Sequence, residues 1–225
     1  AYKGEILGLS GQLGSGAGEI LASIAGALKS RSGSLTLNGE TFLPKSPSQA
    51  IKKKIAYCSS DRKKDGLFLG RPIFENLTSP ALNAISNYGF NFGATEQNFS
   101  KNLAKEFLID VRRMFDESGL LSGGNQQKVA LGKWLSIKPD VLLVNEPTRG
   151  VDVGAKSEIY QRMRDLAARG ITIIFASTDI QEITYLPDRV ITFYRGMMID
   201  EHRLENIQTP TILKEITDPF NETNL

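Results

Sequence analysis

The segment Ile6-Leu-Gly-Leu-Ser-Gly-Gln-Leu-Gly-Ser-Gly-Ala-Gly18 joins a short apolar run to a glycine-rich stretch. Apolar residues then recur at helical spacing, at Ile20, Leu21, Ile24, Ala25 and Leu28. This pattern predicts a strand, a glycine loop and a helix, in that order. The N–H groups of such a loop converge with those of the helix N-terminus and can hold phosphate oxygens. The segment is therefore a candidate phosphate site.

The spacing of the glycines narrows the choice among known phosphate loops. Gly11-x-x-Gly14-x-Gly16 matches the end of a P-loop, in which a Lys for the β and γ phosphates and a Ser or Thr for Mg²⁺ come next. Here those two positions hold Ala17 and Gly18. A dinucleotide-binding fingerprint also fits poorly, because no acidic residue follows at the required distance. Taken alone, the loop is compatible with a phosphate site and equally with a plain tight turn.

The rest of the chain predicts an α/β fold. Mainly apolar stretches lie at residues 54–58, 141–144, 171–176 and 189–194. Such runs, separated by helical patterns, are typical of strands buried on both faces of a parallel sheet that helices cover. Residues 34–42 alternate around an Asn38-Gly39 turn, which predicts an antiparallel hairpin.

The block of residues 72–136 has a different pattern. Phe99, Leu103 and Phe107 lie four residues apart, and Trp134 belongs to a second helical pattern that follows a Ser-Gly-Gly start. We interpret the block as an inserted helical subdomain, with Trp134 and the Phe99 stripe in its core.

The composition excludes several classes of site. Of 225 residues, 27 are Lys or Arg and 25 are Asp or Glu, with one Cys and one His. A single Cys58 forms neither an internal disulfide nor a CxxC zinc knuckle. A single His202, near the C-terminus, leaves no imidazole elsewhere for a Ser-His-Asp triad or a His-rich metal centre. No apolar run approaches the roughly 18 residues that cross a bilayer. The first residues read as the start of a cut fragment rather than as a signal peptide.

Two further segments change the interpretation of the loop. Leu121-Ser-Gly-Gly-Asn-Gln-Gln127 precedes Val141-Leu-Leu-Val-Asn-Glu-Pro147, and Gly150-Val-Asp152 follows. With these motifs in this order, the chain resembles the nucleotide-binding domain of ATP-binding cassette (ABC) transporters. It looks most like the second, C-terminal ATP-binding domain of the ATPase subunit of ribose/galactose-type bacterial sugar importers. The resemblance covers nearly the whole chain, including Asp61-Arg-Lys-Lys-Asp-Gly-Leu-Phe68 and Ser177-Thr-Asp179.

The resemblance implies a domain organisation. It predicts a P-loop, RecA-like core formed by residues 1–71 and 137–225, and a helical signature subdomain formed by residues 72–136. In the family, a strand-rich segment whose aromatic residue stacks on adenine precedes the first strand. We therefore expect this chain to be a fragment of a longer two-cassette protein.

Departures from the family pattern bear on function. The family's Walker B strand ends in an Asp that helps to hold Mg²⁺ and a Glu that polarises water, whereas this chain has Asn145 and then Glu146. Ser60 stands where the family has a Gln, and Thr178 where it has a His. Phosphoryl transfer depends on charge neutralisation by Lys and Mg²⁺. The resemblance therefore implies that this domain alone binds MgATP weakly and hydrolyses it negligibly, with Glu146 vestigial.

The intact signature implies a role in trans. In the family two domains dimerise head to tail, and each nucleotide lies between one domain's P-loop and the other's signature. The expected nucleotide-binding residues are Gly11, Gln12, Leu13, Gly14, Ser15, Gly16, Ala17, Gly18, Glu19, Ser60, Asn145 and Thr178. The expected signature residues acting on the partner's nucleotide are Leu121, Ser122, Gly123, Gly124, Asn125 and Gln126, with Asp152 in the D-loop. The degenerate Mg²⁺ position comprises Gly18 and Asn145.

Plainer interpretations of these residues stay open. Ser122 could simply cap a helix, Gly123-Gly124 could be a close-packing turn, and Asp152 could cap the following helix. Glu146 could be a helix-start charge and Arg149 a solvated side chain. The basic loop 61–71 could contact the membrane partner, contact the nucleotide or be solvated.

The resulting functional expectation is an ATP- and Mg²⁺-dependent carbohydrate importer domain. Its expected partners are a second nucleotide-binding domain, the transmembrane permease subunits and, indirectly, a periplasmic sugar-binding protein. We expect it in the cytoplasm, on the inner face of the plasma membrane through the permease. The alternatives are a structural or regulatory cassette that binds no nucleotide, and an ABC-type ATPase not linked to transport. ATPases of this type that act on nucleic acid carry long insertions, and the short 72–136 block argues against one.

Overall fold

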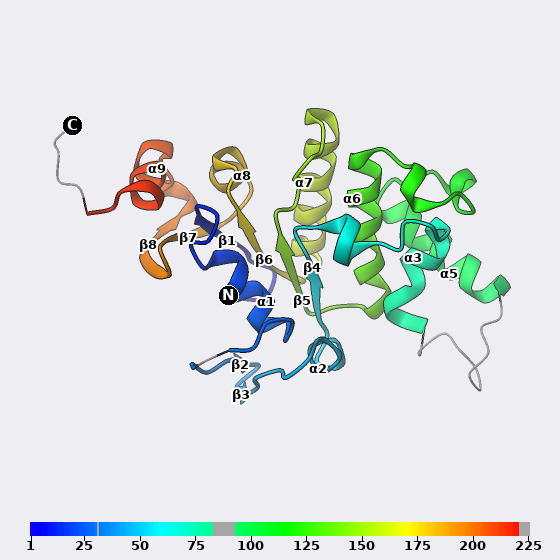
Figure 1. The fold of residues 1–225 in the computed structure, drawn as a ribbon, viewed down its shortest axis with the longest axis horizontal. Helices are drawn as coiled ribbons and strands as arrows, with labels where there is room; N and C mark the ends of the chain where they lie inside the picture. The colour runs from blue at the N-terminus through cyan, green and yellow to red at the C-terminus, as the bar shows by residue number, and fades with distance from the viewer. Residues whose placement is uncertain (31, 83–92, 221–225) are drawn as a thin grey trace. The chain divides into compact units, whose positions relative to one another are not determined.

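The computed structural model describes residues 1–30, 32–82 and 93–220, and these form two compact units (Figure 1). The first unit comprises residues 1–57, 140–146 and 166–225, and the second comprises residues 58–139 and 147–165. The predicted helical block 72–136 lies within the second unit, together with the basic loop and most of the helix that follows the Glu146 strand.

A six-stranded sheet organises the first unit. Its strands, in spatial order, are β4 (Ile55–Cys58), β5 (Val141–Asn145), β6 (Thr172–Ser177), β1 (Ile6–Gly11), β7 (Arg189–Tyr194) and β8 (Met197–Arg203). The pairs β5–β6, β6–β1 and β1–β7 are parallel, and β8 pairs with β7 antiparallel. A separate short hairpin joins β2 (Thr36–Leu37) to β3 (Glu40–Thr41). The predicted fold class is confirmed.

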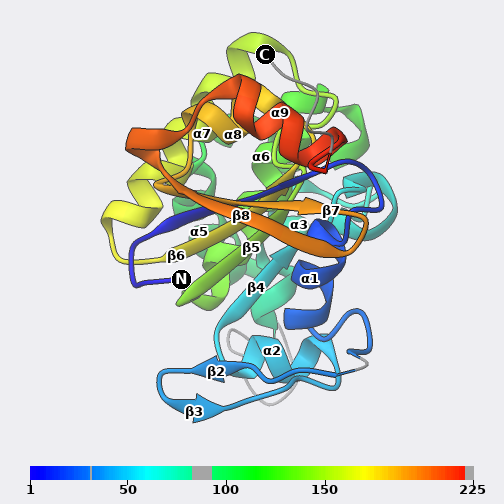
Figure 2. The same ribbon diagram turned by 90° about the vertical axis from the view of Figure 1, so that its left-hand side faces the viewer.

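Helices cover both faces of this sheet, as Figure 2 shows. The helix α1 (Ala17–Ile24) packs on one face, and α8 (Ile180–Tyr185) and α9 (Thr209–Thr217) pack on the other. The short helix α2 (Pro47–Lys52) precedes β4. Leu21 of α1 is completely buried against a core that includes Leu9 of β1 and Leu143 of β5. Burial of each such side chain stabilises the fold by roughly 1.5–3 kcal/mol.

The second unit is helical. It contains α3 (Ile73–Thr78), α5 (Gly93–Glu106), α6 (Gly123–Gly132) and most of α7 (Val153–Ala168), with a π-helical turn at Arg62–Gly66. Leu103 and Phe107 of the predicted stripe are buried, whereas Phe99 and Trp134 are only partly buried. Among the described residues, no helix combines the length and apolar character needed to cross a membrane.

Arg189 of β7 forms ion pairs with Glu5, which directly precedes β1, and with Glu201 of β8. Its Nε donates to Glu5 Oε1 at 2.7 Å, and Nη1 lies 2.9 Å from Glu201 Oε1 on β8. The Arg189 and Glu5 side chains are 16% and 10% exposed. Burial raises the Glu5 pKa, but the hydrogen bond from Arg189, the Tyr2 N–H and the Arg189 charge outweigh it, so the pKa is lowered overall. The stability from this pair is therefore present above the ordinary Glu pKa and is lost as the pH falls through the lowered value.

We predict that Arg189→Met lowers the free energy of unfolding at pH 7 by about 2–3 kcal/mol, because it leaves a buried carboxylate unpaired. The difference from the wild type should shrink below about pH 4, where Glu5 becomes protonated. Urea titrations at pH 7 and at low pH test this. A difference that stays constant with pH would contradict the assignment.

Candidate functional site

The glycine loop lies between the carboxyl end of β1 and the start of α1. Gly14 and Gly16 have φ angles of 79° and 100°, a left-handed conformation that favours glycine. Gly16 precedes α1 and has no side chain to cap it. The N–H groups of Gly18 and Glu19, in the first turn, have no intrahelical partner because of their position. The loop thus presents main-chain donors at a positive helix end.

Close contacts inside the loop fix its path. A methyl group added at Gly11 would lie 2.2 Å from Ser15 Oγ and 2.9 Å from the Phe193 carbonyl oxygen. The Ser15 carbonyl accepts a hydrogen bond from Gly196 N–H at 2.9 Å, which ties the loop to the turn between β7 and β8. Gln12 and Leu13, in contrast, are exposed. Only glycine fits at position 11.

The structure brings together Gly18 and Asn145, which are far apart in sequence. A Cβ atom at Gly18 would lie 2.8 Å from Asn145 Nδ2 and 3.2 Å from Asn145 Oδ1. The amide therefore occupies the space that a side chain at position 18 would enter. Neither Gly18 nor Ala17 offers an oxygen or a charge, and the Asn145 amide is neutral. Hard divalent cations such as Mg²⁺ prefer carboxylate and other charged oxygen ligands, so these residues do not fit a magnesium site well.

Glu146 lies at the end of β5 in a left-handed conformation, with φ 55°. Its N–H donates to the Ala176 carbonyl at 2.8 Å, and its Oε1 accepts from Thr178 N–H at 2.9 Å. The carboxylate is therefore held at the carboxyl edge of the sheet, beside the exposed Thr178. The structure therefore brings Glu146 and Thr178 into contact. Glu146 does not start a helix, since α7 begins at Val153.

The signature residues lie at the start of α6 in the second unit. Ser122 is the N-cap of α6, and its Oγ accepts from Asn125 N–H at 3.4 Å. A methyl group at Gly124 would lie 2.6 Å from Ala155 Cβ on α7. Asp152 caps α7, since its Oδ1 accepts from Ala155 N–H at 3.0 Å. The capping and close-packing interpretations of these residues are therefore confirmed as structural contacts, and they leave the exposed face of Ser122 free for another role.

Three further predicted site residues, Ser60, Leu121 and Gln126, are partly or fully buried. Ser60 belongs to the second unit and is half-buried there, and Leu121, before the cap, is buried. Gln126 is also buried, and its amide donates to the Leu121 carbonyl at 3.2 Å. Gln126 therefore stabilises the signature turn from its buried side and is not exposed to a partner.

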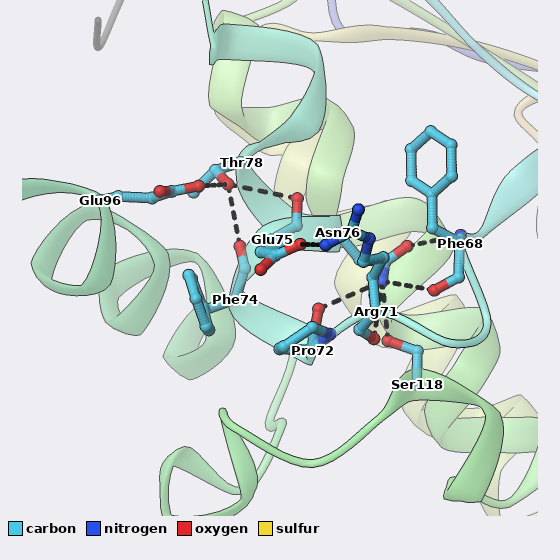
Figure 3. A network of polar contacts seen from close by, with 9 residues as sticks. All are labelled: Phe68, Arg71, Pro72, Phe74, Glu75, Asn76, Thr78, Glu96 and Ser118. Atoms are coloured by element: carbon cyan, nitrogen blue, oxygen red, sulfur yellow. Dashed lines mark hydrogen bonds and ion pairs between the residues drawn. The ribbon is translucent and has the colours of Figure 1, made fainter. Parts of the chain in front are cut away.

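Sequence reasoning missed a polar centre around Asn76, shown in Figure 3. This side chain is completely buried. It accepts from Phe68 N–H at 2.8 Å, donates to the Phe68 carbonyl at 3.0 Å and donates to Ser118 Oγ at 3.0 Å. It also donates to the carbonyls of Arg71 and Pro72. Asn76 therefore fixes the loop that follows the basic turn. It lies in an Asn-Leu-Thr triplet, which carries no signal for such a role.

A groove of about 510 Å³ lies beside this centre, within the second unit. Its lining includes Phe68, Phe74, Leu82 and Arg71. The Phe68 side chain is 61% exposed. Phe74 packs edge to face on Phe115, which is itself 62% exposed. Exposed aromatic residues around a groove are typical of an interaction surface.

The first unit has a groove of about 400 Å³ as well, but it is remote from the loop. It is lined by Val141 and Thr172, the first residues of β5 and β6, and by Leu37 of the hairpin. The glycine loop follows the opposite, carboxyl end of β1, which runs parallel to β6. This groove is therefore no part of the phosphate site.

The chain is similar to known ATP-binding proteins of ABC transporters. The family model described as "ABC transporter" matches residues 1–149. The ribose import ATP-binding protein RbsA of Streptococcus agalactiae is 44% identical over 199 residues, which cover 88% of this chain and 40% of that protein. RbsA of Lactococcus lactis subsp. lactis is 43% identical over 193 residues, which cover 86% and 39%. The chain thus spans about two fifths of the length of these curated relatives.

Solved structures show the same fold. A nucleotide-free ATP-binding cassette from an ABC transporter has a TM-score of 0.78 at 21% identity, and the match covers 89% of this chain and 81% of that one. The ATP-binding cassette MJ0796, in a dimeric post-hydrolysis state bound to ADP and phosphate, has a TM-score of 0.78 at 22% identity, with 91% and 88% covered.

Proposed function

Because this chain belongs to the ABC transporter family, we propose that it is the second ATP-binding domain of a ribose-type sugar import ATPase. In this proposal its own nucleotide site is degenerate and its signature completes the site of a partner cassette. The observation that carries the proposal is the pairing of Gly18 with Asn145, beside Ala17. The similarity to ribose import ATP-binding proteins supports the assignment to sugar import.

The loss of charge at the loop makes the site weak. The main-chain donors of residues 11–19 suit a phosphate, but no side chain at positions 17, 18 or 145 carries a charge. A hydrogen bond to a charged group contributes roughly 1.5–3 kcal/mol. Loss of the lysine and weakening of two metal contacts therefore cost about 4–8 kcal/mol, or on the order of 10³ to 10⁶ in affinity or rate. Glu146, held by Thr178 N–H, then has no bound nucleotide on which to act.

The signature turn keeps the residues that the family uses to contact a partner's nucleotide. Ser122 is exposed at the N-terminus of α6, where main-chain N–H groups and the helix dipole favour a negatively charged group. In our proposal this end of α6 contacts the γ phosphate of ATP held by the partner's P-loop. The dimer described for the cassette MJ0796 supports a pairing of this kind.

We propose further that the groove beside Asn76 receives the permease. It combines the exposed Phe68 and Leu82 with Arg71, Glu75 and Glu96. Since Arg71 Nη1 lies 3.7 Å from Glu75 Oε2, the charges largely offset one another, and the groove suits an apolar segment with polar flanks. This gives one of the predicted functions of the basic loop 61–71, contact with the membrane partner, a physical basis.

The first prediction from the proposed function concerns the glycine loop. In the full-length protein, the combined change Ala17→Lys, Gly18→Thr and Asn145→Asp should increase labelling of this chain by 8-azido-ATP with Mg²⁺ at least about tenfold, because it restores the missing charges. Mass spectrometry of labelled peptides distinguishes this chain from the partner cassette. Leu43→Lys, which adds a charge at an exposed position of the first unit outside the loop, is the matched control and should have no effect. Tight Mg²⁺-dependent labelling of the wild-type chain, or turnover by this chain alone that Glu146→Gln abolishes, would contradict the proposal.

The second prediction concerns the signature. Ser122→Arg in the full-length protein should lower ATPase activity and sugar uptake at least about tenfold, because it places a bulky side chain where the partner's phosphate is contacted. Ser157→Arg, on the exposed part of α7 in the same unit, is the control and should leave both activities unchanged. Wild-type activity of the Ser122→Arg protein would exclude the role in trans.

The third prediction concerns the groove. Phe68→Ala should reduce copurification with the permease and lower sugar uptake several-fold, while stability changes by less than about 0.5 kcal/mol because the side chain is exposed. Leu204→Ala removes a comparably exposed side chain from the first unit and serves as the control. Full uptake by the Phe68→Ala protein would move permease docking to another surface.

A further inference from the structure

Arg62 connects two loops of the second unit that are far apart in sequence. Its Nη1 donates to the Arg149 carbonyl at 2.6 Å and its Nη2 to the Gly150 carbonyl at 3.3 Å. These carbonyls belong to the loop that leads into Asp152 and α7. One guanidinium therefore holds two consecutive peptide groups, which a planar, forked donor does better than an ammonium group.

The same guanidinium borders the signature turn. Arg62 Nε lies 3.5 Å from Gln126 Oε1, and the Gln126 amide in turn donates to the Leu121 carbonyl. A methyl group at Gly123 would lie 2.9 Å from Arg62 Nη2 and 2.6 Å from the Gly150 carbonyl oxygen. The first residue of α6 thus lies directly against the loop that Arg62 holds.

The backbone at Arg62 is itself fixed. It begins the π-helical turn Arg62–Gly66, whose N–H groups at Lys63 and Lys64 donate to Asp61 Oδ1 at 3.1 and 3.0 Å. At the other end of the turn, the buried Lys133 donates its ammonium group to the Gly66 carbonyl. Because the backbone at Arg62 is fixed at both ends of the turn, its side chain can hold residues 149 and 150 in place.

We propose that Arg62 is a positioning residue, which holds residues 149–152 against the N-terminus of α6 so that Ser122 and Asp152 are presented on one surface. This inference rests on the proposed function for its effect on ATP hydrolysis, because that surface is the one assigned to the partner's nucleotide. Its geometric part, the fixing of the two loops, stands on the contacts of Arg62 alone.

The test uses hydrogen–deuterium exchange and kinetics on the full-length protein. Arg62→Met should increase amide exchange in residues 122–127 and 149–155 about tenfold, since two or three hydrogen bonds are lost, and leave the first unit unchanged. It should lower the kcat for ATP at least about tenfold with KM within about threefold, because the partner's P-loop still binds the nucleotide. Arg62→Lys should recover part of both effects. Lys105→Met removes an exposed charge from α5 of the same unit and should change neither.

Each outcome separates the two proposals. Unchanged exchange in both segments of the Arg62→Met protein overturns the positioning role. Increased exchange with wild-type kcat also overturns it if Ser122→Arg lowers kcat in the same assay. If Ser122→Arg is silent as well, the proposed function has failed, and increased exchange supports positioning on its own. Should the Arg62→Met protein fail to fold, Arg62→Lys provides the same comparison.

Discussion

Parallel pairing in register is the constraint on which the first unit depends. Asn145 of β5 pairs with Ala176 of β6, and Ala176 pairs with Leu9 of β1. The carboxyl ends of the three strands therefore end in one row, and the segments that follow them emerge at the same edge of the sheet. This is why the Asn145 amide reaches Gly18, and why Glu146 meets the N–H of Thr178. A shift of one residue in either pairing would turn these side chains to the opposite face.

At this edge of the sheet, the path of the glycine loop and its attraction for phosphate have different physical causes. The tight path of the loop depends on van der Waals contacts such as that between Gly11 and Ser15, which require no ligand. The attraction for a triphosphate depends on cations, and neither a lysine at positions 17 and 18 of the loop nor a carboxylate ligand for Mg²⁺ at position 145 of β5 is present. A chain can therefore keep the shape of a phosphate loop after its charges are lost. The helix N-terminus of α1 alone contributes a partial charge, which is small beside a lysine and a metal ion.

The sequence predicted those parts of the fold that have a local periodic signal. The runs at β5 and β6 are continuous because both faces are buried, and the Asn38-Gly39 turn has the chemistry of a hairpin. It did not predict β8 (Met197–Arg203), an edge strand whose residues are exposed or only partly buried and which shows no alternation to detect. The roles of Arg62 and Asn76 were also missed, because both bind distant main-chain carbonyls, which any residue can offer.

Close packing requires glycine at both signature positions, 123 and 124, apart from any role in binding phosphate. Gly123 has no room for a side chain because the Gly150 carbonyl approaches it, and Gly124 has none because Ala155 does. These contacts set the direction in which the first N–H groups of α6 point. The close packing and the proposed phosphate contact therefore depend on one structure, since a donor that points toward an external anion must first be held by its neighbours. In our proposal, Arg62, which holds one of those neighbours, affects the partner's phosphate without contacting it.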